Sequence, residues 1–129
     1  MLSAYNPPGA AWPGLSQAVG IRGGGLLVTS GITATDAEGN VLGGDFESQV
    51  EAVYANIGRV LGAAGVGFDA IARIVTYVVD YEPGMIPIVR KVRSRFLSAQ
   101  CPPASVLIGI AALYDPRLLI EVEVTANLP

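Results

Sequence analysis

The sequence predicts an α+β domain in which one mixed sheet carries two helices on a single face. Two segments repeat apolar residues at steps of three and four, the period of a helix, and they cover residues 45–64 and 84–98. Five shorter segments are apolar or alternating and rich in Ile, Val and Thr: residues 17–22, 26–30, 70–79, 106–113 and 118–125. Their order is ββαβαββ, with no internal repeat or linker, so we expect a single domain over residues 1–129.

Two β-hairpins are expected from the spacing of the strands. Residues 106–113 and 118–125 are separated by Tyr-Asp-Pro-Arg, where Pro116 fixes φ and Asp115 can bond the backbone ahead of it. Residues 17–22 and 26–30 are separated by three glycines, which suit a tight turn. Residues 1–14, rich in proline and glycine, are expected to lie over the domain as an arm.

The two helices have recognisable ends and polar faces. Asp45 can cap the first helix and Gly65 stands where a C′ glycine belongs, while Gln49 and Asn56 fall seven residues apart on one stripe. The second helix carries half of the eight basic residues, Arg90, Lys91, Arg93 and Arg95. We interpret this basic cluster as a solvated helix face.

The apolar C-terminal strand predicts an oligomer. Residues 106–113 are apolar without alternation, which is typical of a strand buried on both faces, and one layer of helices covers only one face of a sheet. Charged residues make up only 15% of the chain against roughly 25% in an average soluble domain. We therefore expect another subunit on the second face. In 118–125, Glu121 and Glu123 share the face opposite Leu118, Ile120, Val122 and Val124.

Composition narrows the classes of function. The chain has no histidine and one cysteine, Cys101, so zinc sites, histidine-based triads and an internal disulfide are not expected. A net charge of −3 disfavours nucleic acid as a partner. The longest apolar run is too short for a membrane span, and the N-terminus lacks the pattern of a signal peptide. A cytoplasmic protein without a membrane partner is the expectation.

Motifs along nearly the whole chain resemble the Rid family of reactive intermediate deaminases, also called the YjgF or L-PSP endoribonuclease family. They are Ser16-Gln17-Ala18, Thr29-Ser30-Gly31, Gln49 with Asn56-Ile57, Ala63-Ala64-Gly65, Asp80, Pro102 through Ser105, and Ile120-Glu121-Val122-Glu123. The resemblance implies a chorismate-mutase-like fold and a homotrimer with a small-molecule cleft between each pair of subunits. It also implies hydrolysis of the C=N bond of imines and enamines by water, with no metal or other cofactor.

The site implied by the resemblance is only partly present. Ser30 and Gly31 match the segment that lines the cleft, and Glu121 matches the acid that holds the attacking water. The arginine that binds the substrate carboxylate is Ala104 here, the following cysteine is Val106, and the tyrosine before the first strand is Leu15. An asparagine of the pattern falls at Ile88 or Val89. The implied site is thus Glu121 as the catalytic residue and Leu15, Ser30, Gly31, Ala104, Ser105 and Val106 as substrate-binding positions.

Two classes of function stay open at this point. One is a deaminase-type hydrolase that uses Glu121 and water, with weak activity on 2-imino acids because losing a buried arginine–carboxylate contact costs roughly 2 to 5 kcal/mol. The other is a non-catalytic ligand-binding or interaction trimer, in which Glu121 is a structural carboxylate. An endoribonuclease is third, because no aromatic residues line a basic groove. Arg117, in the turn before Glu121, is a candidate for a displaced cation.

Overall fold

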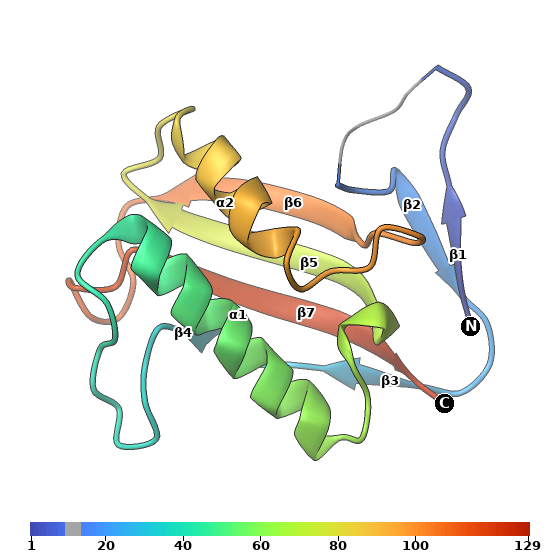
Figure 1. Ribbon diagram of the computed structural model, residues 1–129, viewed down its shortest axis with the longest axis horizontal. Coiled ribbons are helices and arrows are strands. Elements are labelled where there is room, and N and C mark those ends of the chain that lie inside the picture. The colour runs from blue at the N-terminus through green and yellow to red at the C-terminus, as the bar shows by residue number, and fades with distance from the viewer. Residues whose placement is uncertain (10–13) are drawn as a thin grey trace.

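The computed structural model describes residues 1–9 and 14–129 and has a mixed main sheet covered by helices on one face (Figure 1). The strand order is β3-β7-β5-β6, and β4 also pairs with β7. The main sheet consists of β3 (Gly25–Val28), β4 (Ile32–Thr33), β5 (Ile71–Val79), β6 (Ala104–Ile110) and β7 (Ile120–Leu128). β5 runs parallel to β6 and antiparallel to β7. The predicted α+β class is confirmed.

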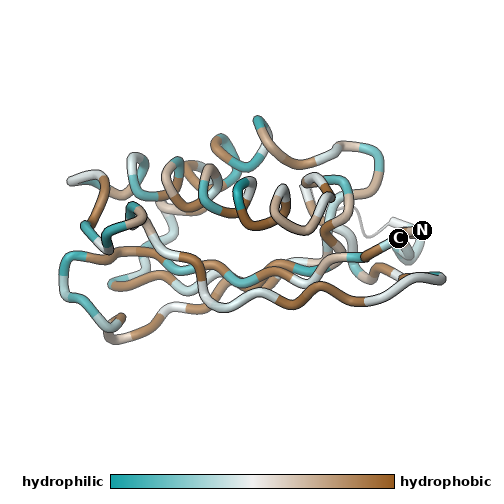
Figure 2. The backbone as a smooth tube through the Cα atoms, turned by 90° about the horizontal axis from the view of Figure 1, so that it is seen from below, coloured by the Kyte–Doolittle hydropathy of each residue, from teal (hydrophilic) through white to brown (hydrophobic). Residues whose placement is uncertain are grey.

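Both helices lie on the same side of this sheet, as Figure 2 shows. Helix α1 (Phe46–Ala63) begins after Asp45, whose side chain accepts a hydrogen bond from the Ser48 backbone N–H at 2.8 Å. Gly65 follows the helix with φ of 76°, as a C′ glycine does. Helix α2 (Met85–Arg93) is shorter than predicted, because beyond Arg93 the backbone continues in turns closed by bonds such as Phe96 N–H to Arg93 C=O.

The hydrophobic core lies between the helices and the sheet. From β7 the side chains of Ile120, Val122 and Val124 are buried there, and they meet apolar residues of α1 and β5. Glu121 and Glu123 point to the other side of the sheet, so the predicted alternation of this strand is confirmed. We call the side of the main sheet that faces away from the helices the open face.

The pairing registers define which residues share the open face. β5 and β6 align Arg73 with Ala104, Val75 with Val106 and Tyr77 with Ile108. β5 and β7 align Arg73 with Thr125, Val75 with Glu123 and Tyr77 with Glu121. On β3, Leu26 and Val28 are 60% and 67% exposed and belong to the same face.

Both predicted hairpins are wrong. β5 lies between β6 and β7, and residues 111–119 make the connection past it. β2 (Ala18–Ile21) pairs with β1 (Leu2–Tyr5) in a separate two-stranded sheet, whereas β3 pairs with β7. Part of the expected N-terminal arm is therefore a strand, while residues 10–13 of it lie outside the described part. Strand periodicity identifies strands but not their partners, and the turn at Gly23 and Gly24, both at positive φ, passes the chain from one sheet to the other.

Strand β6 is covered on one face only. Its open-face side chains Val106 and Ile108 are 39% and 41% exposed in the single chain. The expected burial on both faces is thus not met within one subunit. No helix in residues 1–9 and 14–129 is long and apolar enough to cross a membrane.

Candidate functional site

The carboxylate of Glu121 lies against the backbone of Gly31. Pairing of Thr33 on β4 with Glu121 on β7 brings the segment that contains Ser30 and Gly31 to this point. A Cβ atom built on Gly31 would overlap the Glu121 carboxylate, so the two residues are in direct contact. Ser30 is exposed beside them. Three of the residues selected from the sequence are therefore adjacent at one end of the open face.

The Glu121 carboxylate forms no hydrogen bond or ion pair with any described residue, although it is half-buried. Its neighbour Glu123 differs, because it accepts a short hydrogen bond from the Tyr77 hydroxyl. That bond raises the pKa of Tyr77 above its usual value, burial and the charges of Glu123 and Glu121 add to the rise, and Arg73 opposes it. Glu121 is thus free to accept a proton or to hold a water molecule.

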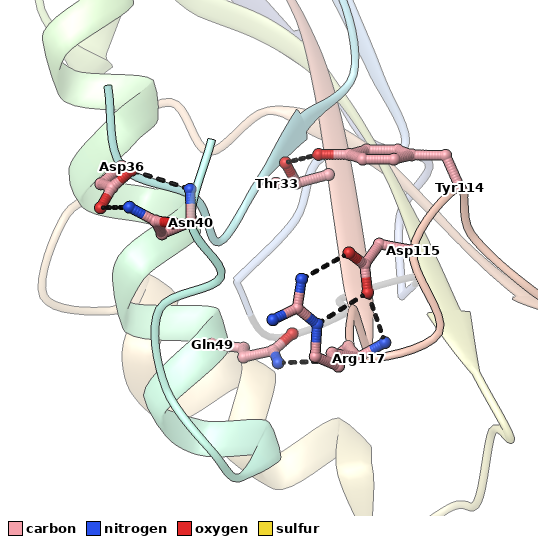
Figure 3. A network of polar contacts seen from close by, with 7 residues as sticks. All are labelled: Thr33, Asp36, Asn40, Gln49, Tyr114, Asp115 and Arg117. Carbon is pink, nitrogen blue, oxygen red and sulfur yellow. Dashed lines mark hydrogen bonds and ion pairs between the residues drawn. The ribbon is translucent and has the colours of Figure 1, made fainter. Parts of the chain in front are cut away.

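The hydroxyl groups of Thr33 and Tyr114 face each other (Figure 3), and the β4–β7 register places Thr33 beside Glu121. The Thr33 side-chain oxygen lies 3.4 Å from the Tyr114 hydroxyl and 3.3 Å from that of Thr35. Tyr114 is 73% exposed, in the connection between β6 and β7. The sequence alone does not mark Tyr114 as part of this site, because it is an exposed tyrosine in a turn. Its partner Thr33 comes next to Glu121 only through the β4–β7 pairing.

The other selected residues lie at the start of β6. Ala104 and Val106 are on the open face, whereas the Ser105 side chain points to the helix layer, where its Oγ accepts a hydrogen bond from Arg93 Nη1 at 3.1 Å. Leu15 precedes Ser16, which bridges to Ala104 and whose N–H donates to the Pro103 carbonyl at 3.1 Å.

These two groups of residues are far apart in one chain. Ala104 pairs with Arg73 and Glu121 pairs with Tyr77, so they are separated by four residues along β5 and by two strand spacings across it. With about 3.3 Å per residue and about 4.8 Å per strand, the separation is roughly 16 Å. A small molecule cannot contact both groups within a single subunit.

Arg117 does not point its guanidinium into this region. Its Nη2 and Nε donate to the Asp115 carboxylate at 2.8 and 3.1 Å, as Figure 3 shows. These bonds lower the pKa of Asp115 to about 2. The buried Gln49 side chain holds the same turn, donating to the Arg117 carbonyl and accepting from the Leu119 N–H, both at 2.8 Å. Arg117 therefore does not serve as a displaced cation in this arrangement.

A cavity of about 350 Å³ lies in the helix layer, near Leu15. Its lining combines apolar side chains with two arginines and includes Leu15, Arg90, Arg93, Leu97 and Pro102. It is on the opposite side of the sheet from Glu121. In the part of the chain that the structure describes, no cluster of His, Cys, Asp and Glu could hold a metal ion.

Comparison with known proteins places the chain in a family. The model of the endoribonuclease L-PSP family matches residues 8–128. The chain belongs to this family, which is the Rid or YjgF family. A Rid-family protein of unknown function from Yersinia pestis, YyfB, is 35% identical, with a TM-score of 0.92 over 98% of both chains.

Other Rid relatives are more distant. A YjgF-family protein from Mycobacterium tuberculosis is 25% identical, with a TM-score of 0.67 over 98% of this chain and 99% of its own. AldR of Lactococcus lactis, provisionally named a regulator, is 30% identical over 105 residues, which are 81% of this chain and 80% of that protein. The chorismate-mutase-like fold expected from the sequence is thus confirmed, whereas these relatives do not share one stated activity.

Proposed function

We propose that the protein is a homotrimer that binds small metabolites in clefts between its subunits and hydrolyses the C=N bond of imines or enamines there. The observation that carries the proposal is the Glu121 carboxylate, which contacts Gly31 on the open face and has no hydrogen-bond or ion-pair partner among the residues that the structure describes. In a chain without histidine it is the carboxylate placed to act as a general base.

The separation of the two residue groups supports a site shared by two subunits. The group with Ser30, Gly31 and Glu121 lies at one end of the open face, and the group with Ala104 and Val106 lies at the other. When sheets of neighbouring subunits meet, opposite ends from two chains can face one another. The exposed apolar side chains of β3 and β6 give such an association its hydrophobic contribution.

In the proposed reaction Glu121 holds a water molecule and accepts one of its protons while the oxygen adds to the imine carbon. That proton then passes from Glu121 to the nitrogen, which gives an amino alcohol. The hydroxyl group of this intermediate gives its proton to the nitrogen through Glu121, the C–N bond breaks, and a carbonyl compound and ammonia are released. One imine and one water give one carbonyl compound and one ammonia, so no redox cofactor is needed.

Archetypal 2-imino acids are expected to be poor substrates. Ala104 offers no bidentate partner to a carboxylate, and Val106 and Leu15 are apolar as well. We therefore place the natural substrate among neutral imines or those whose anionic group lies elsewhere.

The test measures ammonia release from freshly generated imines, with and without a carboxylate. Wild type and Glu121→Gln are compared, and Glu38→Gln, an exposed loop glutamate, is the matched control. We expect Glu121→Gln to lower turnover at least about a hundredfold and Glu38→Gln to leave it unchanged. Turnover that persists in Glu121→Gln would show that the general base is elsewhere.

The second candidate is a non-catalytic ligand-binding trimer. Apolar residues at Ala104, Val106 and Leu15 favour it, because these are the positions where the resembled pattern carries arginine, cysteine and tyrosine. Ligand-induced stabilisation of the wild-type protein without any ammonia release would support this candidate. The acidic net charge gives no support to an endoribonuclease, and neither do the described basic side chains, most of which are engaged.

A further inference from the structure

Arg73 differs from most other basic residues because its side chain has no hydrogen-bond or ion-pair partner in the described part of the chain. Six of the eight basic side chains form hydrogen bonds or ion pairs: Arg22 with Tyr5, Arg59 with Asn56, Lys91 with Glu47, Arg93 with Ser105 and Gly14, Arg95 with Glu51, and Arg117 with Asp115. Among residues 1–9 and 14–129, Arg73 and Arg90 have no such contact. Arg90 belongs to helix α2, in the helix layer. Of these two arginines, Arg73 is the one on the open face.

The register of the sheet places Arg73 directly beside Ala104. The two residues are partners in the parallel β5–β6 pair and point to the same face. On its other side Arg73 is the partner of Thr125. Ala104 is a small neighbour for the arginine side chain, and Val75 and Val106 form the next, apolar pair along the two strands.

An unpaired arginine on a face that becomes covered needs an anion. Removing a guanidinium from water without a partner is costly, so assembly across the open face favours a carboxylate at Arg73. Its neighbours on this face, Ala104, Thr125, Val75 and Val106, carry no charge. Glu123, opposite Val75 on the same face, accepts a hydrogen bond from Tyr77 and forms no ion pair with Arg73.

We propose that Arg73 is the carboxylate-binding residue of the cleft and that the ligand is a small organic acid. The inference rests on the proposed function and specifies its substrate class. Arg73 stands one strand, about 4.8 Å, from Ala104, where the resembled pattern has its arginine. The cleft then selects acids whose carboxylate is separated from the reacting C=N carbon by a longer spacer than in 2-imino acids. A planar guanidinium can hold such a carboxylate by two parallel hydrogen bonds.

The experiment measures binding by calorimetry with stable keto acids as probes. 4-Oxopentanoate has the longer spacer, 2-oxobutanoate has the shorter one, and the methyl ester of each lacks the charge. We expect wild type to bind 4-oxopentanoate in preference to its ester and to 2-oxobutanoate. Arg73→Gln should weaken 4-oxopentanoate binding at least about thirtyfold without changing ester binding. The affinity of Arg73→Lys for 4-oxopentanoate should lie between those of wild type and Arg73→Gln.

Two further variants separate a local charge effect from a structural one. Arg90→Gln removes the other unengaged arginine and should bind 4-oxopentanoate like wild type. The double variant Arg73→Gln with Ala104→Arg returns a cation to the neighbouring strand, and it should regain carboxylate binding with the preference moved towards 2-oxobutanoate. Equal affinity of wild type and Arg73→Gln for 4-oxopentanoate would overturn the proposal, as would a wild-type protein that does not prefer the acid to its ester.

Failure of this inference is distinguishable from failure of the proposed function. One outcome is that ammonia release from a neutral imine depends on Glu121 and is unaffected by Arg73→Gln, while no carboxylate binds. That outcome would overturn the role of Arg73 and leave the proposed hydrolase activity intact. Carboxylate binding that requires Arg73, without ammonia release from any imine, would confirm Arg73 as the anion site of a non-catalytic trimer. If Arg73→Gln dissociates the oligomer and the remaining assembled protein binds the acid normally, Arg73 pairs with another subunit and the proposal is wrong.

Discussion

Gly31 lies so close to the Glu121 carboxylate that one added methyl group would displace it. A Cβ atom at this position overlaps the end of a flexible side chain rather than backbone. Gly31→Ala is therefore expected to change the free energy of unfolding by less than about 1 kcal/mol, while ammonia release falls about a hundredfold, because a shift near 1 Å has that effect on reactivity.

The control for this variant is Gly44→Ala, where an added Cβ meets no atom within 4 Å. It should retain wild-type turnover. A Gly31→Ala protein that is fully active would show that the carboxylate does not need its contact with Gly31. Thermal unfolding measured in parallel separates loss of the site from loss of the fold.

Single residues also show which parts of the arrangement can be predicted from sequence and which cannot. Ser30, Gly31 and Glu121 were selected by family resemblance, and the β4–β7 pairing brings them together. Arg73 carries no such signal in the sequence, because one arginine in an apolar strand is an ordinary surface residue until its partner strand is known. Alternation gives the face of each residue, but the neighbours across the sheet depend on a strand order that no local pattern contains.

At the level of elements, Gln49 connects helix α1 to the turn that leads into β7. Its side chain is 1% exposed and satisfies the Arg117 carbonyl and the Leu119 N–H. Gln49→Leu fills a similar volume but leaves both backbone groups unpaired. We expect it to lower the free energy of unfolding by about 2 to 4 kcal/mol, measured in urea.

The matched control is Gln100→Leu, an exposed glutamine whose side chain has no hydrogen-bond partner among the described residues. It should change stability by less than about 0.5 kcal/mol. Similar stability of the two variants would mean that the turn is held by other contacts. Asn56, seven residues after Gln49 on the same helix, has a similar role, because its Nδ2 donates to the Thr33 and Thr35 carbonyls. Both polar side chains thus connect helix α1 to neighbouring backbone.

Helix α1 also buries a tyrosine whose hydroxyl has no partner in the described part of the chain. Burial raises the pKa of Tyr54 to about 12, while the charge of Arg93 opposes this. The folded state then retains a proton that the unfolded state releases near pH 10. The contribution of protonated Tyr54 to the free energy of unfolding is fully present below pH 10 and is lost as pH rises towards and through 12.

Tyr54→Phe tests this assignment. Removing an unpaired buried hydroxyl should raise the free energy of unfolding at pH 7 by up to about 1 kcal/mol. The variant should also lose less stability than wild type between pH 10 and 12. A strongly destabilised Tyr54→Phe protein would indicate that the hydroxyl has a partner, such as a bound water molecule.

The two wrong hairpins have a common physical cause at this level. Each was inferred from short sequence separation, yet the main sheet inserts β5 between β6 and β7 and joins β3 to β7. The parallel β5–β6 pair follows from the crossover through α2, a long-range arrangement set by packing of the helices on one face. The ends of helix α1 were predicted better, because its caps Asp45 and Gly65 act locally.

At the level of the whole molecule, the open face explains both the low charge content and the uncovered side of β6. Leu26, Val28, Val106 and Ile108 are exposed there in a single chain. Groups of exposed apolar side chains of this kind are typical of interaction surfaces. In the proposed trimer such faces would meet, and the same association would complete a cleft from the two separated residue groups.

Ile108→Lys should therefore dissociate the proposed trimer without unfolding the subunit. Ile108 is 41% exposed on the open face, so a lysine is solvated in the monomer but would be covered without a partner in the assembly. Val60→Lys is the matched control, because Val60 is 39% exposed on helix α1 in the layer that faces away from the sheet's open side. Light scattering at micromolar concentration should give three times the subunit mass for wild type and Val60→Lys, and a lower mass for Ile108→Lys.

Because two subunits are needed to bring Glu121 near Ala104 of another chain, Ile108→Lys should also lose ammonia release and binding of 4-oxopentanoate. A monomeric wild-type protein that still binds the acid would refute the shared site, whereas loss of both properties together in Ile108→Lys would tie the chemistry to the assembly.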